Sequence, residues 1–243
     1  HTEGQHDKVK EIYLEGSRHN HLVTAFVMGF LAAFSGYIMT GWVGPNAELV
    51  DAAGLLALFT LPFQLNVLTG PASAYFRAIG RPAQELRFPL CQLGLVAVLV
   101  GVAFVLFGVG IWTIAYAVAL AMILSAFYYL AYANRHTRVS QVTFLRRVLL
   151  PGCVPYVVGM AISLCLDTLL SAYGWTTVGD DRLTAIAIVL VAGAIYSVIC
   201  FAAIYTLVCE PGERAFLTDK LARVVNRVRR RGGKSSRAHA TSQ

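Results

Sequence analysis

The sequence predicts an all-α membrane protein built as a bundle of six transmembrane helices. Of its 243 residues, 57% are hydrophobic and 14% are charged, and the mean hydropathy is +0.62. Ordinary soluble domains are less apolar and carry more charge. The chain also contains six apolar runs that are long enough to cross a bilayer, for which a helix needs about 20 residues. The runs cover residues 22–43, 50–77, 88–109, 111–133, 148–172 and 183–208.

Polar segments flank the apolar runs at both ends of the chain. Near the start, Val9, Ile12 and Tyr13 recur at helical spacing, which predicts an amphipathic helix on the membrane surface. Near the end, an apolar stripe from Leu217 to Val228 lies among arginines and lysines, as in a basic helix on an anionic leaflet. We therefore divide the chain into a cytoplasmic amphipathic segment (1–20), a six-helix domain (21–209), a basic amphipathic cytoplasmic helix (210–231) and a disordered tail (232–243).

The distribution of basic residues predicts the orientation of the bundle. Counted between the apolar runs, 19 of the 20 Lys and Arg fall on one side of the membrane, and Arg182 alone falls on the other. Lys and Arg accumulate in cytoplasmic loops, so both termini are expected in the cytoplasm of a multi-pass protein of the cell membrane. The indoles of Trp42, Trp112 and Trp175 fall on the opposite side, where tryptophan favours the headgroup boundary.

The net charge of +7 predicts contact with anionic membrane lipid rather than with nucleic acid, because the basic residues lie in loops beside the membrane. No metal site is expected: His19 and His21 are two residues apart, do not share a helical face, and have no carboxylate or cysteine nearby. A glycine-rich phosphate loop with lysine is also absent. We therefore expect neither a cofactor nor enzymatic activity.

A polar patch interrupts the second apolar run and supplies the first candidate site. Gln64, Asn66 and Thr69 lie there, directly before Gly70 and Pro71. Polar side chains and irregular backbone are tolerated at this depth where protein covers them or where they line a wet cavity. Two interpretations remain open. The patch lines a substrate pathway, or its amides hydrogen-bond to a neighbouring helix while the Gly-Pro pair kinks or breaks the run.

Tyr37 in the first run and Asp167 in the fifth are further candidates. An ionisable residue inside a span is costly and is by default a functional candidate. Asp167 either faces a cavity and couples a proton or ion, or reaches the nearby interface. Three tyrosines near the end of the fourth run are assigned to an aromatic belt at the cytoplasmic interface, with a carbohydrate platform as the alternative. They are Tyr128, Tyr129 and Tyr132.

Two stretches carry a resemblance to a known family. The segments Asn66-Val-Leu-Thr-Gly-Pro71 and Phe76-Arg-Ala-Ile-Gly-Arg-Pro82 resemble a helix and loop in the carboxy-terminal half of Wzx-like polysaccharide flippases. These flippases belong to the multidrug/oligosaccharidyl-lipid/polysaccharide exporter superfamily. The resemblance covers most of residues 5–210 in helix order, loop charge and spacing, and it is strongest over 4–82.

The resemblance implies one lobe of a two-lobe flippase fold, which moves a polyprenyl-diphosphate-linked glycan from the inner to the outer leaflet by alternating access. The passage would need either a missing amino-terminal six-helix lobe or a second copy of this chain, and we expect the sequence to be a fragment. Guanidinium groups at the cytoplasmic mouth would contact the diphosphate, unless they serve topology alone. The candidate substrate-pathway residues are Tyr37, Gln64, Asn66, Thr69, Arg77, Arg81 and Asp167.

Two alternative functions remain open. One is a lobe of a drug or small-molecule antiporter of the same superfamily, which would be expected to carry more acidic residues in its spans than Asp167 alone. The other is a non-transporting membrane scaffold in a polysaccharide-assembly complex. A polar stripe facing a cleft on the first two spans would oppose the scaffold, and a uniformly apolar surface would favour it.

Overall fold

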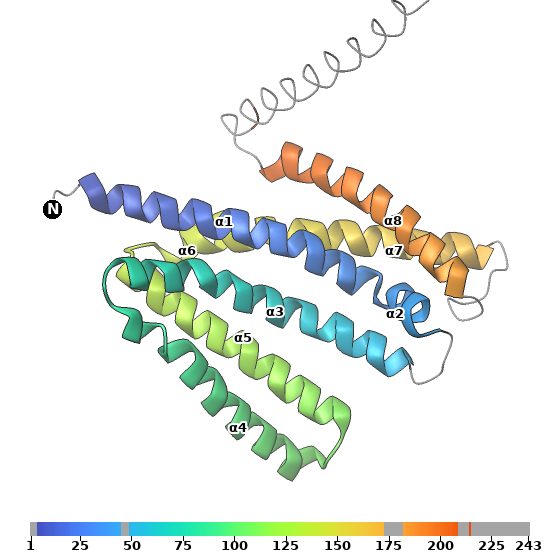
Figure 1. The fold of residues 1–243 in the computed structure, drawn as a ribbon, viewed down its shortest axis with the longest axis horizontal. Helices are drawn as coiled ribbons and strands as arrows, with labels where there is room; N and C mark the ends of the chain where they lie inside the picture. Colours follow the sequence, from blue (N-terminus) through green and yellow to red (C-terminus); the bar gives the residue numbers. More distant parts are fainter. Residues whose placement is uncertain (1–3, 45–48, 173–181, 209–213, 215–243) are drawn as a thin grey trace, which may run out of the picture. The chain divides into compact units, whose positions relative to one another are not determined.

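The computed structural model describes residues 4–44, 49–172, 182–208 and 214, and over these residues it is helical without strands (Figure 1). The predicted tail 232–243, Trp175 and, apart from Arg214, the predicted basic helix lie outside the described residues. The longer helices are α1 (Gly4–Ala33), α2 (Ser35–Val43), α3 (Leu49–Ala78), α4 (Arg87–Phe107), α5 (Ile111–His136), α7 (Val154–Ala172) and α8 (Arg182–Ala203). The short ones are η1 (Pro82–Gln84), α6 (Gln141–Phe144), η2 (Leu145–Leu149), η3 (Pro151–Cys153) and η4 (Ile204–Val208).

The chain forms two compact units, His1–Cys200 and Phe201–Gln243. In the second unit the described part consists of the end of α8, η4 and Arg214, whose Nη2 donates a hydrogen bond to the carbonyl oxygen of Thr206 at 2.7 Å. In the first unit, we call the end of the helices that carries Trp42 and Trp112 the Trp end, and the end that carries Arg77 the Arg end.

Membrane-spanning helices make up the described chain, as predicted. Five segments are long and apolar enough to cross a bilayer, and the bent pair α1 and α2 makes a sixth if it counts as one span. The five are Asp51–Ala78, Pro82–Phe107, Ile111–His136, Gln141–Ala172 and Arg182–Val208. The protein is therefore a multi-pass helical membrane bundle.

The break in the helical pattern lies in the first span. Helices α1 and α2 meet at an angle of 70°, and Phe34 between them has φ −111° and ψ 18°, outside the α-helical region. The Phe34 ring is fully buried and packs against the rings of Phe30 and Tyr196, so tertiary packing holds the bend. Because no proline or turn separates the amphipathic segment from the span, α1 runs through both as one helix.

Helix α3 is continuous through Gly70 and Pro71, so the break allowed for by the sequence does not form. A proline inside a helix leaves the carbonyl four residues earlier without its usual partner, and for Pro71 this is the carbonyl of Val67. The Nδ2 of Asn20 on α1 donates a hydrogen bond to that oxygen at 3.0 Å. A side chain of the neighbouring helix thus satisfies the freed backbone group, which is how prolines are accommodated in membrane helices.

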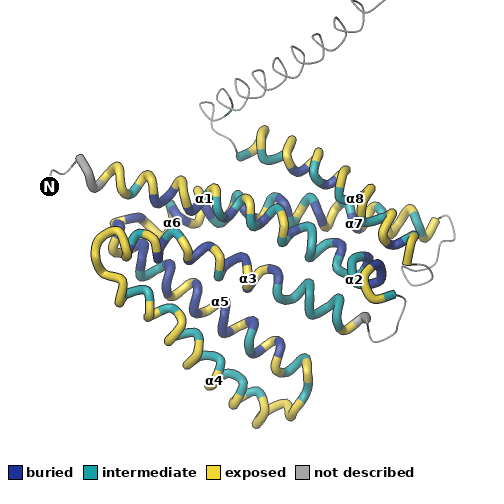
Figure 2. Tube along the Cα trace, viewed as in Figure 1, coloured by how far each residue is buried: buried dark blue, intermediate teal, exposed yellow. Residues whose placement is uncertain are grey.

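The third and fourth apolar runs form a tight hairpin, α4 and α5. Gly108, with φ 77°, turns the chain between α4 and α5 in a conformation that favours glycine. Helix α4 packs on α5 and has no buried residue, whereas α5 has a buried face, drawn dark blue in Figure 2. The exposed side of α4 is apolar and therefore suits contact with lipid.

The main hydrophobic core lies at the Arg end, between α1, α3, α5 and the α6–η2 segment. It contains Phe76, Tyr129 and Val148, all fully buried. The Tyr129 hydroxyl lies 3.2 Å from the hydroxyl of Ser73 on α3. The assignment of Tyr129 to an interfacial belt is therefore wrong. Its ring faces α3, and the side chain can be buried because its hydroxyl has a hydrogen-bond partner.

Helix α7 begins irregularly and packs closely on α1. Pro151 lies in η3 and Pro155 in the first turn of α7, where a missing N–H costs little. Further along, Gly29 of α1 and Gly159 of α7 allow the two backbones to approach, because a Cβ added at either glycine would meet backbone of the other helix at 3.0 Å. Small residues at such crossings are typical of membrane bundles.

Candidate functional site

Helix α2 is held by two polar contacts at the Trp end. The hydroxyl of Tyr37 donates a hydrogen bond to Oδ1 of Asp167 on α7. One turn further along α2, the carbonyl oxygen of Gly41 accepts a hydrogen bond from Nε of Arg182 on α8 at 2.9 Å. A cation near the carboxyl end of a helix is favourable, because the last carbonyls and the helix dipole present partial negative charge there. A carboxylate of one helix and a guanidinium of another thus fix the short segment beyond the bend.

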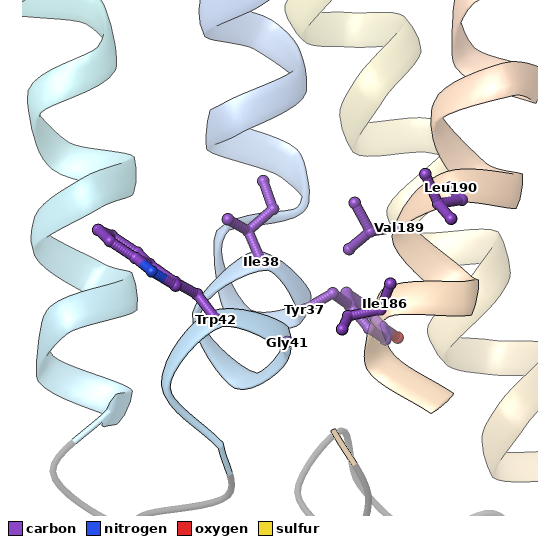
Figure 3. A pocket seen from close by; sticks show the side chains of 7 residues that line it. All are labelled: Tyr37, Ile38, Gly41, Trp42, Ile186, Val189 and Leu190. Carbon is purple, nitrogen blue, oxygen red and sulfur yellow. The ribbon is translucent and has the colours of Figure 1, made fainter. Parts of the chain in front are cut away.

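A pocket of about 250 Å³ lies between α2 and α8 beside these contacts (Figure 3). The side chain of Tyr37 reaches from α2 toward α8, and the Trp42 ring points away from α8 toward the opposite side of α2. Apart from the tyrosine hydroxyl and the indole nitrogen, the lining side chains are apolar. The lining residues are Tyr37, Ile38, Gly41, Trp42, Ile186, Val189 and Leu190.

A second polar contact lies in the interior, between α1 and α3. The amide nitrogen of Gln64 is 3.2 Å from both ring nitrogens of His21, and the two side chains are 1% and 3% exposed. The imidazole also lies against Gly152 of η3, where an added Cβ would overlap the ring. Within the described residues, the amide oxygen of Gln64 is buried without a hydrogen-bond partner. Position 152 therefore requires glycine, and the amide retains one unused acceptor.

The other two residues of the polar patch, Asn66 and Thr69, are joined to each other within α3. Thr69 is buried, and its hydroxyl donates to the carbonyl oxygen of Asn66 at 2.7 Å on the same helix. Asn66 itself is half-buried. The patch thus faces α1 through Gln64, while Thr69 satisfies its hydroxyl within α3.

The two candidate arginines lie at the Arg end, Arg77 in the last turn of α3 and Arg81 in the segment that follows it. Arg77 is 61% exposed, with its Nε 3.6 Å from Oε2 of Glu85, and Arg81 is exposed at the start of η1. The guanidinium of Arg87 lies 4.6 Å above the ring of Tyr132. Exposed ion pairs of this kind hold a side chain only weakly, so Arg77 is available to a ligand in this turn.

Of the seven predicted residues, the structure brings Tyr37 and Asp167 into contact across two helices, and it joins Thr69 to Asn66 by a hydrogen bond within α3. Gln64 and Arg77 are 13 residues apart on one helix, which corresponds to about 20 Å at 1.5 Å per residue. Sequence reasoning missed Asn20, and it did not assign Arg182 to the site. The available signal for Arg182 was its position as the single basic residue on its side of the membrane.

Comparisons with protein-family models, with curated proteins and with solved structures found no match for this chain. Among the residues that the structure describes, no three His, Cys, Asp or Glu side chains gather to hold a metal ion. The class that the fold and the site define is thus a multi-pass helical membrane protein with a bent first span, and its function is a matter for proposal.

Proposed function

We propose that the chain is a transport lobe, equivalent to the carboxy-terminal half of a flippase for polyprenyl-diphosphate-linked oligosaccharides. It would lie in the cell membrane with both termini in the cytoplasm. Its lipid-linked substrate would move from the inner to the outer leaflet by alternating access, without a chemical step. A second six-helix lobe, or a second copy of the chain, would supply the other wall of the passage.

The observation that supports this proposal best is the bent first span with its polar anchor. Transport sites are commonly formed where a membrane helix is discontinuous. Here α2 turns by 70° at Phe34, and its Tyr37 is bonded to Asp167, a carboxylate inside an apolar helix. Such a residue marks a functional position more often than a structural one. Breaking the Tyr37–Asp167 bond would free α2 to move about Phe34, which is the kind of two-state element that alternating access requires.

The exposed arginines support the substrate class. Arg77 and Arg81 lie at the Arg end, which the positive-inside rule assigns to the cytoplasm. A diphosphate entering from that side would meet two guanidinium groups, each able to bind phosphate oxygens through a forked pair of N–H groups. Glu85 competes for one of them at 3.6 Å, a distance at which an exposed pair is weak.

One observation favours the scaffold as a second candidate. Several polar side chains on α3 are used in contacts inside the bundle: Gln64 with His21, Thr69 with its own helix, and Ser73 with Tyr129. Helix α4 shows a surface of apolar residues. A protein that only holds enzymes together would need no more polar surface than this.

Transport can be measured with the protein, expressed from its own gene, in proteoliposomes. The substrate is a polyprenyl-diphosphate oligosaccharide, extracted from the source cells and labelled with a fluorophore. Its arrival in the other leaflet is read with a quencher that does not cross the membrane. We expect transport by the native protein and a reduction of at least tenfold for Asp167→Asn. A scaffold would leave the labelled lipid where it started.

Asp51→Asn provides the matched control. Asp51 also lies in a helix at the Trp end and also accepts a hydrogen bond, from Nε1 of Trp112 at 3.0 Å, but it is on α3 and that bond joins it to α5. The same loss of charge at Asp51 should leave the transport rate within about twofold of the native rate. An equal loss in both variants would indicate a general effect of charge and would remove Asp167 from the mechanism.

A further inference from the structure

The pocket between α2 and α8 is open to the membrane. Its lining residues Trp42, Ile186 and Leu190 are 73%, 39% and 69% exposed, and they lie on helices that cross the bilayer. Hydrocarbon therefore surrounds the pocket, and a lipid chain is the occupant that its walls can accept. Lipid tails are about as apolar as leucine, so the walls themselves give little preference for one lipid over another.

Arg182 supplies the chemistry that can select among lipids. It precedes Ile186 by four residues, which places both side chains on one face of α8, with Arg182 one turn nearer the Trp end. Its Nε is engaged by the carbonyl oxygen of Gly41, which also lines the pocket. Among the described residues this is the hydrogen bond that the structure gives Arg182, so its two Nη groups are available to a ligand.

A guanidinium that is anchored in this way presents a forked pair of N–H groups in a fixed direction, the geometry that suits a phosphate. The amino end of α8 adds partial positive charge at the same place. Among the described residues, Asp167 is bonded to the lining residue Tyr37: its Oδ1 accepts the Tyr37 hydroxyl, which offsets part of the charge that the carboxylate presents.

We propose that this pocket, together with Arg182, binds one anionic phospholipid of the surrounding bilayer. An acyl chain lies along the walls between α2 and α8, and the phosphate lies on the Nη groups of Arg182. A soluble anion could use the arginine but not the pocket, and a polar peptide could not enter hydrocarbon. The bound lipid would bridge α2 to α8 and so stabilise the short helix beyond the bend. The proposal does not depend on flippase activity.

A tryptophan introduced at Leu190, which lines the pocket from α8, can report on this site, because bromine atoms on a lipid chain quench an indole on contact. The native Trp42 is unsuitable because its ring points away from α8. The protein would carry Trp42→Phe, Trp112→Phe, Trp175→Phe and Leu190→Trp, in phosphatidylcholine vesicles. Brominated phosphatidylglycerol and brominated phosphatidylcholine with identical chains are then compared. One basic residue near a surface is worth about a fivefold preference for anionic lipid, so half-maximal quenching should need about fivefold less phosphatidylglycerol. Equal quenching by the two lipids would overturn the proposal.

Four variants separate a built site from diffuse charge. Arg182→Gln should abolish the preference. Arg182→Lys keeps the charge but loses the fork and the anchor, so it should also lose most of the preference; full retention by lysine would refute the assigned geometry. Arg87→Gln removes a charge at the Arg end and should change nothing. Val189→Phe fills the pocket and should return quenching of the introduced tryptophan by the anionic lipid to the level of phosphatidylcholine.

Two additions cover the remaining outcomes. Inorganic phosphate, added as a competitor, should leave the quenching unchanged, and displacement of the lipid would show instead a site for a free anion. If the single-tryptophan protein does not fold, the native chain can be examined by mass spectrometry after equilibration with equal amounts of the two lipids. Retained phosphatidylglycerol should then exceed phosphatidylcholine about fivefold, and Arg182→Gln should equalise them. Equal retention by the native chain would also refute the site.

Discussion

Alanine at position 29 tests the close crossing of α1 and α7. A Cβ there would lie 3.0 Å from the carbonyl carbon of Pro155, 3.1 Å from its oxygen and 3.1 Å from the backbone nitrogen of Tyr156. These are backbone atoms, which cannot rotate away as a side chain can. Gly159 meets α1 equally closely, at 3.0 Å from the carbonyl oxygen of Gly29. The two helices must therefore separate to accept the methyl group.

Two opposing terms set the size of the effect. Overpacking of a tight interface costs about 1–3 kcal/mol. Replacing a helical glycine by alanine recovers up to about 1 kcal/mol of helix propensity. Gly16 lies on the same helix with nothing within 4 Å of its added Cβ, so Gly16→Ala carries the second term alone. The difference between the two variants isolates the steric cost, and we expect Gly29→Ala to be less stable than Gly16→Ala by about 1–3 kcal/mol.

Reversible unfolding in mixed micelles of a mild detergent and dodecyl sulfate, followed by helical circular dichroism, measures this difference. In a thermal experiment, each kcal/mol of unfolding free energy should shift the midpoint temperature by roughly 2–4 °C in a domain of this size. Gly16→Ala should match or exceed the native protein, and Gly29→Ala should unfold earlier than either. If both variants gain stability equally, the backbones of α1 and α7 do not approach as described, and the packing argument fails.

Two further substitutions, each with a control, test the core and the hairpin. Leu68→Ala leaves a cavity at a fully buried position of α3 and should cost about 2–5 kcal/mol of unfolding free energy. Leu93→Ala, on the exposed side of α4, should cost under about 1 kcal/mol because lipid fills the space, and similar losses at both sites would place Leu68 outside the core. Gly108→Ala places a side chain on a backbone with φ 77° and should lower the unfolding free energy by about 1–3 kcal/mol in the same assay. Gly94→Ala, in a helix and with no neighbour within 4 Å of its added Cβ, should leave the stability unchanged or raise it. An unchanged stability of Gly108→Ala would exclude this turn conformation.

The surroundings of Pro71 in α3 could not be predicted from the local sequence. Pro71 by itself predicts a kink or a break, because it removes one backbone hydrogen bond and crowds the preceding turn. The helix continues because Asn20, 47 residues earlier, donates to the carbonyl of Val67. No local pattern indicates that partner, since Asn20 lies in the polar stretch before the first apolar run and would serve equally well in a surface helix.

At Phe34 the helix bends although its local sequence predicts a continuous helix. Phenylalanine is an ordinary helix residue, and the sequence around it reads as one apolar span. The helix nevertheless turns by 70°, because the buried Phe34 ring packs with those of Phe30 and Tyr196 and because Asp167 and Arg182 hold α2 from two other helices. Contacts between segments more than 100 residues apart decide this geometry.

The sequence by itself determined that the protein is a multi-pass membrane protein, that it has five or six spans, and roughly which residues form each of them. It could do so because a membrane helix must satisfy its own backbone and be apolar along about 20 residues, which are local requirements. The tertiary structure alone decided which polar groups meet: Tyr37 with Asp167, Gln64 with His21, and Arg182 with the carbonyl oxygen of Gly41. Those pairings depend on how the helices are rotated and how closely they approach, and that is set by packing across the bundle rather than along any one helix.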